Sequence, residues 1–331
     1  MVAPAPRPSL SARRKLFDAR FGDGFFYYAT LLFASLILLL VLWLGSQLFR
    51  AAAPAIDKFG LNFLTSSVWK SADDPIAPDT YGAWPYIYGT LMSSFLALIL
   101  AVPIGVATAI FLAEIAPQWI RTPLSFMVEL LAAVPSVVYG LWGRLILIPA
   151  ILPLQGWLSQ HASRWPVVGR FFEGAPLGPS MMAGGLILAI MILPFITAVS
   201  REVIKAVPAT QREAAFGLGA THWEAISGPI LRTARSGIIG AVILGLARAL
   251  GETMAITMVI GNGNKANASL LAPANTLSSK LALEFAEASG GQQSALMYLA
   301  LTLFCITIVV NAIARGLIWN MARTVKGSTR G

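Results

Sequence analysis

Long apolar runs alternate with polar stretches along the chain, and this alternation predicts helices that span a membrane. Six runs are long enough, at about 25–49, 86–113, 124–153, 180–199, 237–260 and 295–318. A spanning helix needs about 20 predominantly apolar residues. Because every backbone polar group in lipid must be bonded within the protein, such runs form helices. We therefore expect an all-α polytopic membrane protein with six transmembrane helices.

The composition supports this class and excludes an ordinary soluble protein. Of the 331 residues, 56% are hydrophobic and 12% are charged, and the mean hydropathy is +0.72. A soluble globular chain carries about 25% charged residues. The net charge of +9 does not indicate nucleic-acid binding, because the Lys and Arg residues cluster at the ends of apolar runs. Cys305 lies alone in an apolar run, and His161 and His222 lack ligand spacing, so we assign no metal.

The distribution of positive charge predicts the orientation. With the N-terminus in the cytoplasm, fifteen Lys and Arg residues fall in cytoplasmic segments and seven in external ones, as the positive-inside rule requires. Both termini are then cytoplasmic. The expected organisation is a cytoplasmic tail at 1–24, a first transmembrane helix with an external segment at 25–84, a core of five transmembrane helices at 85–320 and a cytoplasmic tail at 321–331.

Two further patterns lie within this core. Pro135 and Pro149 interrupt the third run, which is therefore predicted to be broken. In the external stretch 275–288, Leu277, Leu281 and Phe285 recur every fourth residue behind possible N-caps at Asn275 or Thr276. This spacing predicts an amphipathic helix that lies at the membrane surface or covers a pathway.

The cytoplasmic loop at 200–235 predicts two short helices. Thr210 to Glu213 and Thr221 to Glu224 each fit a capping box, and Gly217 and Gly219 lie between them as a hinge. Small and aromatic side chains on such a segment suit docking into a cleft of a soluble partner. An ordinary capped surface helix is the alternative. The candidate docking residues are Glu213, Ala214, Ala215, Gly219, Thr221, Trp223 and Glu224.

The order of residues in this loop resembles a known family. E-A-A, with Gly219 six residues after Glu213, resembles the EAA loop of ABC importer membrane subunits. The wider stretch E-A-A-F-G-L-G-A-T-H-W-E, followed by R-A-L-G-E-T-M-A and I-G-N, is similar to the PstC family of phosphate permeases. E-L-L-A-A-V-P-S-V-V-Y-G at 129–140 and F-A-E-A-S-G at 285–290 extend the resemblance, which covers roughly 85–320. The family loop commonly closes with Leu-Pro, whereas Leu231 is followed here by Arg232.

This resemblance implies a fold, an activity and partners. The fold is the type I ABC importer permease (MetI-like) fold, in the bacterial cytoplasmic membrane. The activity is translocation of phosphate by alternating access, with the EAA loop forming the coupling helices. The implied partners are a second, PstA-like permease subunit, two PstB-like ATPase subunits and an external PstS-like phosphate-binding protein. The chain has no P-loop, so we expect no enzyme activity and no cofactor of its own, with ATP and Mg²⁺ bound by the ATPase subunits.

Two charges lie near the middle of the fifth run. Arg248 and Glu252 are four residues apart, which places them on one face of a continuous helix. A charge at this depth costs at least ~2.5–3.5 kcal/mol and normally faces a polar interior or a partner. The Arg248 fork matches phosphate oxygens. Glu252 either holds that fork or accepts a hydrogen bond from a protonated phosphate oxygen. A structural ion pair or a clamp to the partner permease is the alternative.

Weaker candidates accompany this pair. Thr253 continues toward the outer face, and Glu129 lies near the cytoplasmic end of the third run, where it can cap a broken helix. Arg144 can extend outward from the same run. The predicted substrate-pathway residues are Arg248, Glu252, Thr253 and Glu129.

Other functions are compatible with parts of this pattern. A permease for another oxyanion such as molybdate, sulfate or phosphonate fits the charged pair equally well. A polytopic membrane enzyme would need clustered acid, base or metal ligands near one interface, and the sequence shows no such cluster. A channel would not need a capped docking segment.

Overall fold

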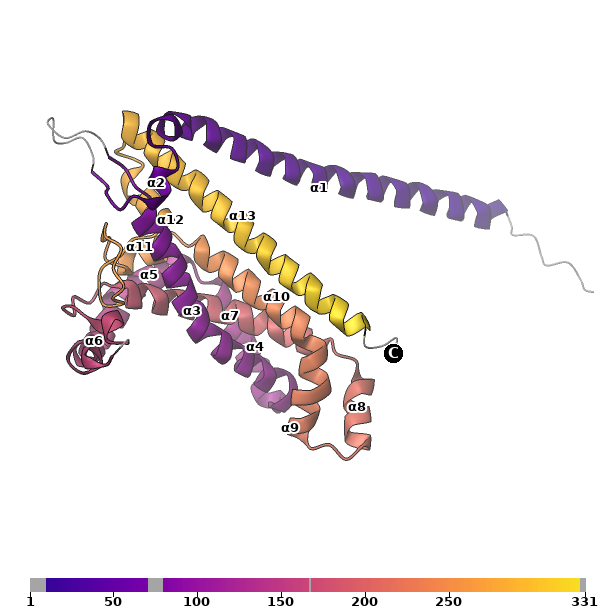
Figure 1. Ribbon diagram of the computed structural model, residues 1–331. Coiled ribbons are helices and arrows are strands. Elements are labelled where there is room, and N and C mark those ends of the chain that lie inside the picture. Colours follow the sequence, from indigo (N-terminus) through magenta and orange to yellow (C-terminus); the bar gives the residue numbers. More distant parts are fainter. Residues whose placement is uncertain (1–9, 71–79, 167, 328–331) are drawn as a thin grey trace, which may run out of the picture. The chain divides into compact units, whose positions relative to one another are not determined.

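The structure is a computed structural model that describes residues 10–70, 80–166 and 168–327. The chain divides into two compact units, Met1–Ala51 and Ala52–Gly331. Helix α1 (Leu10–Phe59) begins in the first unit and ends in the second (Figure 1). The second unit carries all the candidate site residues.

Six helices among the described residues are long and apolar enough to cross a membrane, which confirms the predicted number. They are Asp23–Phe59, Trp84–Ile115, Ser136–Arg164, Met181–Lys205, His222–Leu250 and Gly290–Gly316. The second consists of α3 (Trp84–Ile110) and the π-helix η1 (Phe111–Ile115), and the last belongs to α13 (Gly290–Gly327). The third and fifth spans differ from the predicted runs.

The predicted third span, 124–153, is wrong in its limits because the chain breaks in the middle of it. Helix α4 (Gln118–Ala133) stops where Val134 becomes extended, with φ −64° and ψ 130°. Pro135 disfavours the helical conformation at the residue before it. The spanning helix starts after this break, as α5 (Ser136–Trp142), the π-helix η2 (Gly143–Leu147) and α6 (Ile148–His161).

The predicted fifth span, 237–260, is also divided. Helix α9 (His222–Ala225), the π-helix η5 (Ile226–Ile230) and α10 (Leu231–Leu250) follow one another directly, and α10 ends at the cap Gly251. A separate short helix, α11 (Met254–Val259), carries the rest of the apolar run. The span therefore begins earlier than predicted and breaks just after Arg248.

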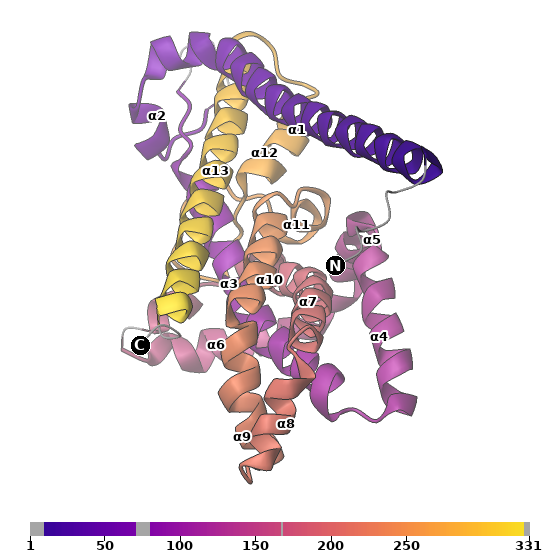
Figure 2. The ribbon, with the colours of Figure 1, turned by 90° about the vertical axis from the view of Figure 1, so that its right-hand side faces the viewer.

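Helix α7 (Met181–Lys205) is the centre of packing in the second unit. Of its spanning window, 67% is buried, more than in any other span. Helices α3 and α10 run beside it (Figures 1 and 2). Small residues let these backbones approach closely: a Cβ atom at Gly185 would lie 2.4 Å from Leu96 Cδ2 of α3, and one at Gly245 of α10 would lie 2.9 Å from Ile196 Cγ1.

Helix α12 (Leu277–Glu284) confirms the helix predicted in the stretch 275–288. Thr276 is its N-cap, and its hydroxyl accepts a hydrogen bond from Ser279 N–H at 3.1 Å. Leu277 is buried, which explains the apolar face of the pattern.

Lys280, which the pattern left unassigned, fastens α12 to its surroundings. Its side chain is buried, pairs with Glu284 and donates to Asn264 Oδ1 at 3.2 Å. Its ammonium also lies over the rings of Trp69 and Tyr86, at 4.9 and 5.2 Å from their centroids. Desolvation lowers the pKa of Lys280, although the hydrogen bond to Glu284 acts in the opposite direction. Helix α12 is therefore fixed to the rest of the second unit by the contacts of Lys280.

The contact between α5 and α11 gives a test of this packing. A Cβ atom at Gly140 would lie 2.7 Å from Met258 Sδ and 2.9 Å from Ala255 Cα, so Gly140→Ala must displace the backbone of α11. We expect a loss of about 1–3 kcal/mol in stability, measured as a lower midpoint of thermal aggregation in detergent. Gly156→Ala in α6, where a Cβ meets no atom within 4 Å, is the control. Equal midpoints for the two variants would contradict the close contact.

Candidate functional site

Arg248 is an unpaired cation at the end of α10. Its guanidinium Cζ lies 4.0 Å from the centroid of the Phe195 ring, and its Nε is buried without a hydrogen-bond partner. No carboxylate of the described residues forms an ion pair with it. The C-terminal end of α10 favours a cation there, as does the ring face. No hydrogen bond to a described residue occupies the remaining guanidinium donors.

Glu252 does not neutralise Arg248, and the predicted shared helix face is wrong. Glu252 lies beyond the end of α10, and its Oε1 accepts a hydrogen bond from Ala255 N–H at 3.1 Å. Its carbonyl oxygen accepts a hydrogen bond from Ser278 Oγ at 2.6 Å. The Glu252 carboxylate thus bonds a backbone N–H in the first turn of α11, while the Glu252 carbonyl bonds Ser278 of α12. The hypothesis that Glu252 holds the Arg248 fork does not fit this geometry.

Thr253 lies in the same break. Its hydroxyl donates to Gly251 O at 3.3 Å. Both residues line a hollow of about 440 Å³, together with Ser278 and Phe285. The break in the fifth span therefore opens beside a space rather than into packed side chains.

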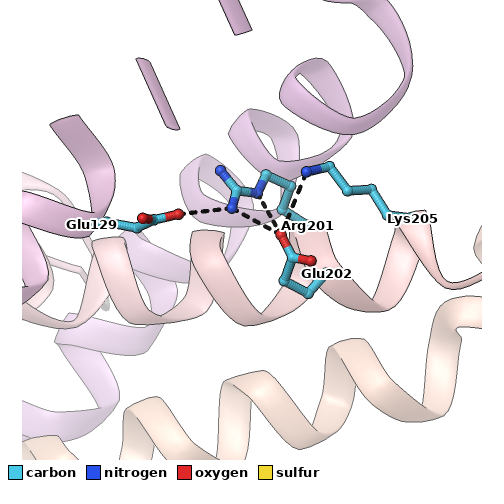
Figure 3. Close-up of polar contacts among 4 residues, drawn as sticks. All are labelled: Glu129, Arg201, Glu202 and Lys205. Atoms are coloured by element: carbon cyan, nitrogen blue, oxygen red, sulfur yellow. Dashed lines mark hydrogen bonds and ion pairs between the residues drawn. The ribbon is translucent and has the colours of Figure 1, made fainter. Parts of the chain in front are cut away.

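Glu129 belongs to a different cluster, at the far end of α7 (Figure 3). Its Oε1 accepts a hydrogen bond from Arg201 Nη2 at 2.9 Å, and Glu202 Oε1 accepts from the same nitrogen at 2.8 Å. Lys205 adds a longer contact to Glu202 at 3.5 Å. The Arg201 side chain is only 8% exposed, whereas that of Glu129 is 56% exposed. Glu129 therefore ties α4 to α7 and does not cap a broken helix, and its place on a substrate pathway stays a prediction.

The segment at 200–235, which is predicted to be cytoplasmic, forms the two helices that its pattern predicts, α8 (Ala209–Gly217) and α9. They lie side by side beyond α10 (Figures 1 and 2). The chain turns between them at Gly219, whose φ is +83°. The capping box of Thr221 and Glu224 is confirmed, with both reciprocal hydrogen bonds present. The first predicted box is wrong, because α8 begins after Pro208 without a side-chain cap.

Most of the predicted docking residues are exposed on these helices. Glu213, Ala214, Thr221 and Glu224 are exposed, and Trp223 is 66% exposed. Two further apolar residues, Phe216 and Leu218, which the pattern did not single out, are 43% and 90% exposed.

The three side chains of Phe216, Leu218 and Trp223 form what we call the apolar tip. Phe216 and Leu218 thus add exposed apolar surface to the segment on which Trp223 is the predicted anchor, and docking of a partner there stays a prediction.

Arg212 fastens α8 to the membrane helices. Its Nε donates to both Glu114 carboxylate oxygens at 3.2 Å, and its Nη2 forms an ion pair with the same carboxylate. Nη1 donates to Val207 O, and Nη2 also donates to Ile204 O at 2.9 Å. The hydrogen bond to Glu114 raises the pKa of Arg212 and outweighs the lowering by desolvation. One guanidinium thus joins α8, the C-terminal end of α7 and η1.

Comparison with known proteins assigns this architecture to a family. Residues 101–326 match the family model described as "Binding-protein-dependent transport system inner membrane component". The chain belongs to this family. Because the family consists of transport components, this member is a multi-pass subunit of a transporter and not an enzyme.

Individual members of the family are similar to the chain over almost its whole length. The "Phosphate transport system permease protein PstC" of Haemophilus influenzae is 42% identical and covers 95% of this chain and 99% of its own. The protein of the same name from Mesorhizobium japonicum is 41% identical and covers 97% of each. These relatives confirm the resemblance read from the sequence motifs.

A solved structure supports the fold alone. A bacterial ABC transporter "involved in the import of the acidic polysaccharide alginate" has a TM-score of 0.50 and 17% identity, covering 71% of this chain and 78% of the other. The type I permease architecture expected from the sequence is consistent with this likeness.

Sequence reasoning missed the residues whose role depends on distant partners. Arg201, Arg212 and Glu114 lie in or beside apolar runs, and their pairing joins positions up to 98 residues apart. The charges at the ends of the spans were the available signal, but the sequence analysis used them only to predict which loops are cytoplasmic. Leu218 carried a clearer signal, because it is apolar between two glycines of a polar loop.

The bonds of Arg212 to Glu114, Val207 O and Ile204 O, which we call the Arg212 tether, give a direct prediction. Arg212→Ala leaves the largely buried Glu114 carboxylate and two carbonyls without this donor, at a cost of about 1–3 kcal/mol. We expect amide hydrogen exchange across α8 to accelerate about tenfold. Arg235→Ala in α10, an exposed arginine with no bond to a described residue, should leave exchange unchanged. Unaltered protection of α8 in Arg212→Ala would show that the tether contributes nothing.

Proposed function

We propose that this chain is the phosphate-translocating permease subunit of an ATP-driven importer in the bacterial cytoplasmic membrane. The observation that carries the proposal is near-full-length similarity, at 41–42% identity, to proteins named phosphate transport system permease PstC. The unpaired Arg248 guanidinium supports it on chemical grounds. A planar fork of donors matches the oxygens of a tetrahedral anion, and a charge within a spanning helix is normally functional.

The proposed mechanism is alternating access around the break in the fifth span. Arg248 lies in the last turn before Gly251, and Glu252 and Thr253 occupy the break itself. Since Glu252 is already used by Ala255 N–H, an incoming anion meets the cation without displacing a carboxylate. Movement of α10 against α11 changes which side of the membrane the guanidinium faces.

In this proposal, ATP hydrolysis by partner subunits supplies the energy for transport. Two PstB-like ATPase subunits dock on α8 and α9, the apolar tip filling a cleft on one of them. A PstA-like permease completes the membrane pathway, and a PstS-like protein delivers phosphate outside. The Arg212 tether then carries displacement of α8 to α7 and η1, so that docking motions reach the spans.

The alternatives differ in measurable ways. Molybdate, sulfate and phosphonate are also oxyanions, and Arg248 alone does not reject them. A channel or a membrane enzyme would not co-purify with an ATPase subunit. We favour the importer because a channel leaves the exposed α8–α9 segment without a role.

The first test is ATP-dependent uptake of radiolabelled phosphate by proteoliposomes that hold the full complex. Arg248→Gln removes the charged donors, so we expect uptake to fall about tenfold to hundredfold while assembly is retained. Arg232→Gln, an exposed arginine on the same helix without a bond to a described residue, is the control. Normal uptake by Arg248→Gln would make this arginine a structural clamp. Transport of sulfate or molybdate in place of phosphate by wild type would overturn the substrate.

The second test addresses the docking surface. Leu218→Asp puts a charge on the most exposed side chain of the apolar tip, and we expect affinity for the ATPase subunit to fall at least about fivefold. The measurement is the fraction of ATPase retained when the tagged permease is purified from solubilised membranes. Leu177→Asp, at an apolar residue that is 62% exposed in a distant loop, is the matched control. Equal retention by both variants would exclude Leu218 from the interface.

A further inference from the structure

A second unpaired arginine lies in a hollow on the outer side of the break. The hollow has a volume of about 470 Å³, and its lining includes Arg144 of η2, Thr257 of α11, Leu283 of α12, and Gly261 and Asn262 of the turn that follows α11. This volume falls within the range of small-molecule sites, about 300–1,000 Å³. The hollow faces the loop that the positive-inside rule places outside the cytoplasm.

The fold brings Arg144 to this position by an uncommon local structure. Residues 143–147 form a π-helix, a form found mostly as short bulges at functional sites. Gly143, just before Arg144, permits close contact with α11, because a Cβ there would lie 2.9 Å from Val259 Cγ1. The tight contact of η2 with α11 thus holds the arginine at the mouth of the hollow.

The charge of Arg144 has no protein partner among the described residues. No hydrogen bond, ion pair or ring contact joins it to any of them. Arg201 and Arg212, by contrast, each pair with a carboxylate. An arginine held within a spanning helix and left unpaired is costly unless water or a ligand solvates it, and Arg144 is exposed to the hollow.

Other groups in the hollow complement a protonated oxyanion. Asn262 has a left-handed backbone, with φ 55°, and its side-chain amide adds a donor. The bonds from Gly263 N–H to Ala274 O and from Ala274 N–H to Ile260 O fix this turn. The Thr257 hydroxyl already donates to Thr253 O at 2.5 Å. Its oxygen can therefore accept only from a ligand that carries a proton, such as monohydrogen phosphate.

We infer that this hollow is an outer subsite that binds a tetrahedral oxyanion through Arg144 before the anion reaches Arg248. Arg144 lies on η2, which packs against α11, and Arg248 lies in the last turn of α10, which the break at 251–253 joins to α11. The inference rests on the proposed oxyanion pathway and adds to it an outer site that binds the anion first.

A cysteine probe reads the charge of the hollow directly. Leu283→Cys, in a Cys305→Ser background that removes the one native thiol, places a reporter in the same hollow as Arg144. Reaction rates with an anionic and a cationic methanethiosulfonate reagent are compared in the assembled complex in nanodiscs. We expect a preference for the anionic reagent that drops about fivefold in Arg144→Gln and is retained in Arg144→Lys. Arg170→Gln, at an arginine outside the lining, controls for general surface charge.

Protection by ligand then separates the outcomes. Inorganic phosphate at millimolar concentration should slow modification of the Leu283→Cys thiol, and this protection should disappear in Arg144→Gln. Protection by sulfate or molybdate but not by phosphate would keep the subsite and overturn phosphate as the substrate. A thiol that reacts without charge preference, that no oxyanion protects, or that is shielded by the second permease would overturn the subsite. In each of these three outcomes, phosphate uptake by wild type and its loss in Arg248→Gln would still support the proposed function.

Discussion

Unbonded backbone groups within a membrane are so costly that a spanning helix can break only where something else satisfies them. This constraint shapes both breaks in the chain. At the first, the Tyr139 hydroxyl donates to Leu131 O at 2.8 Å, across Val134 and Pro135. At the second, the Glu252 carboxylate accepts from Ala255 N–H and Ser278 donates to Glu252 O. Side-chain hydrogen bonds thus satisfy backbone groups beside each break, and at the second break Gly251 and Thr253 also line a hollow.

The breaks also explain which parts of the molecule could be predicted from sequence. Apolar run length alone gave six spans, and the Thr221 box and the α12 pattern gave local helices, because these depend on neighbours within a few residues. The end of α10 did not follow from the pattern. Gly251 lies inside an apolar run, and helix continuation there is decided by contacts of Glu252 with residues 26 positions away. The sequence therefore predicted that Arg248 and Glu252 share one helix face, whereas Arg248 lies in α10 and Glu252 lies beyond its end.

Four arginines of the second unit, Arg144, Arg201, Arg212 and Arg248, fall into two groups with different contacts. Arg201 and Arg212 lie toward one end, where carboxylates and helix carbonyls satisfy them. Such pairs are costly to disrupt by removal of one partner, so they join elements that must move together. Arg144 and Arg248 form no ion pair with a carboxylate in the part of the chain that the structure describes. An unpaired arginine can bind an anion without first breaking an ion pair, which a satisfied pair cannot do.

In the proposed mechanism, these two groups define a path for force and a path for substrate that meet at α7. The Arg212 guanidinium bonds carbonyls near the end of α7, while Phe195, in the middle of the same helix, supports Arg248. Helix α7 is the most buried span and packs against α3 and α10 with glycine contacts, and densely packed interiors transmit strain. In the proposed mechanism, a displacement received at α8 therefore reaches the Phe195 ring through α7, and the fifth span responds at Gly251, where it is already divided.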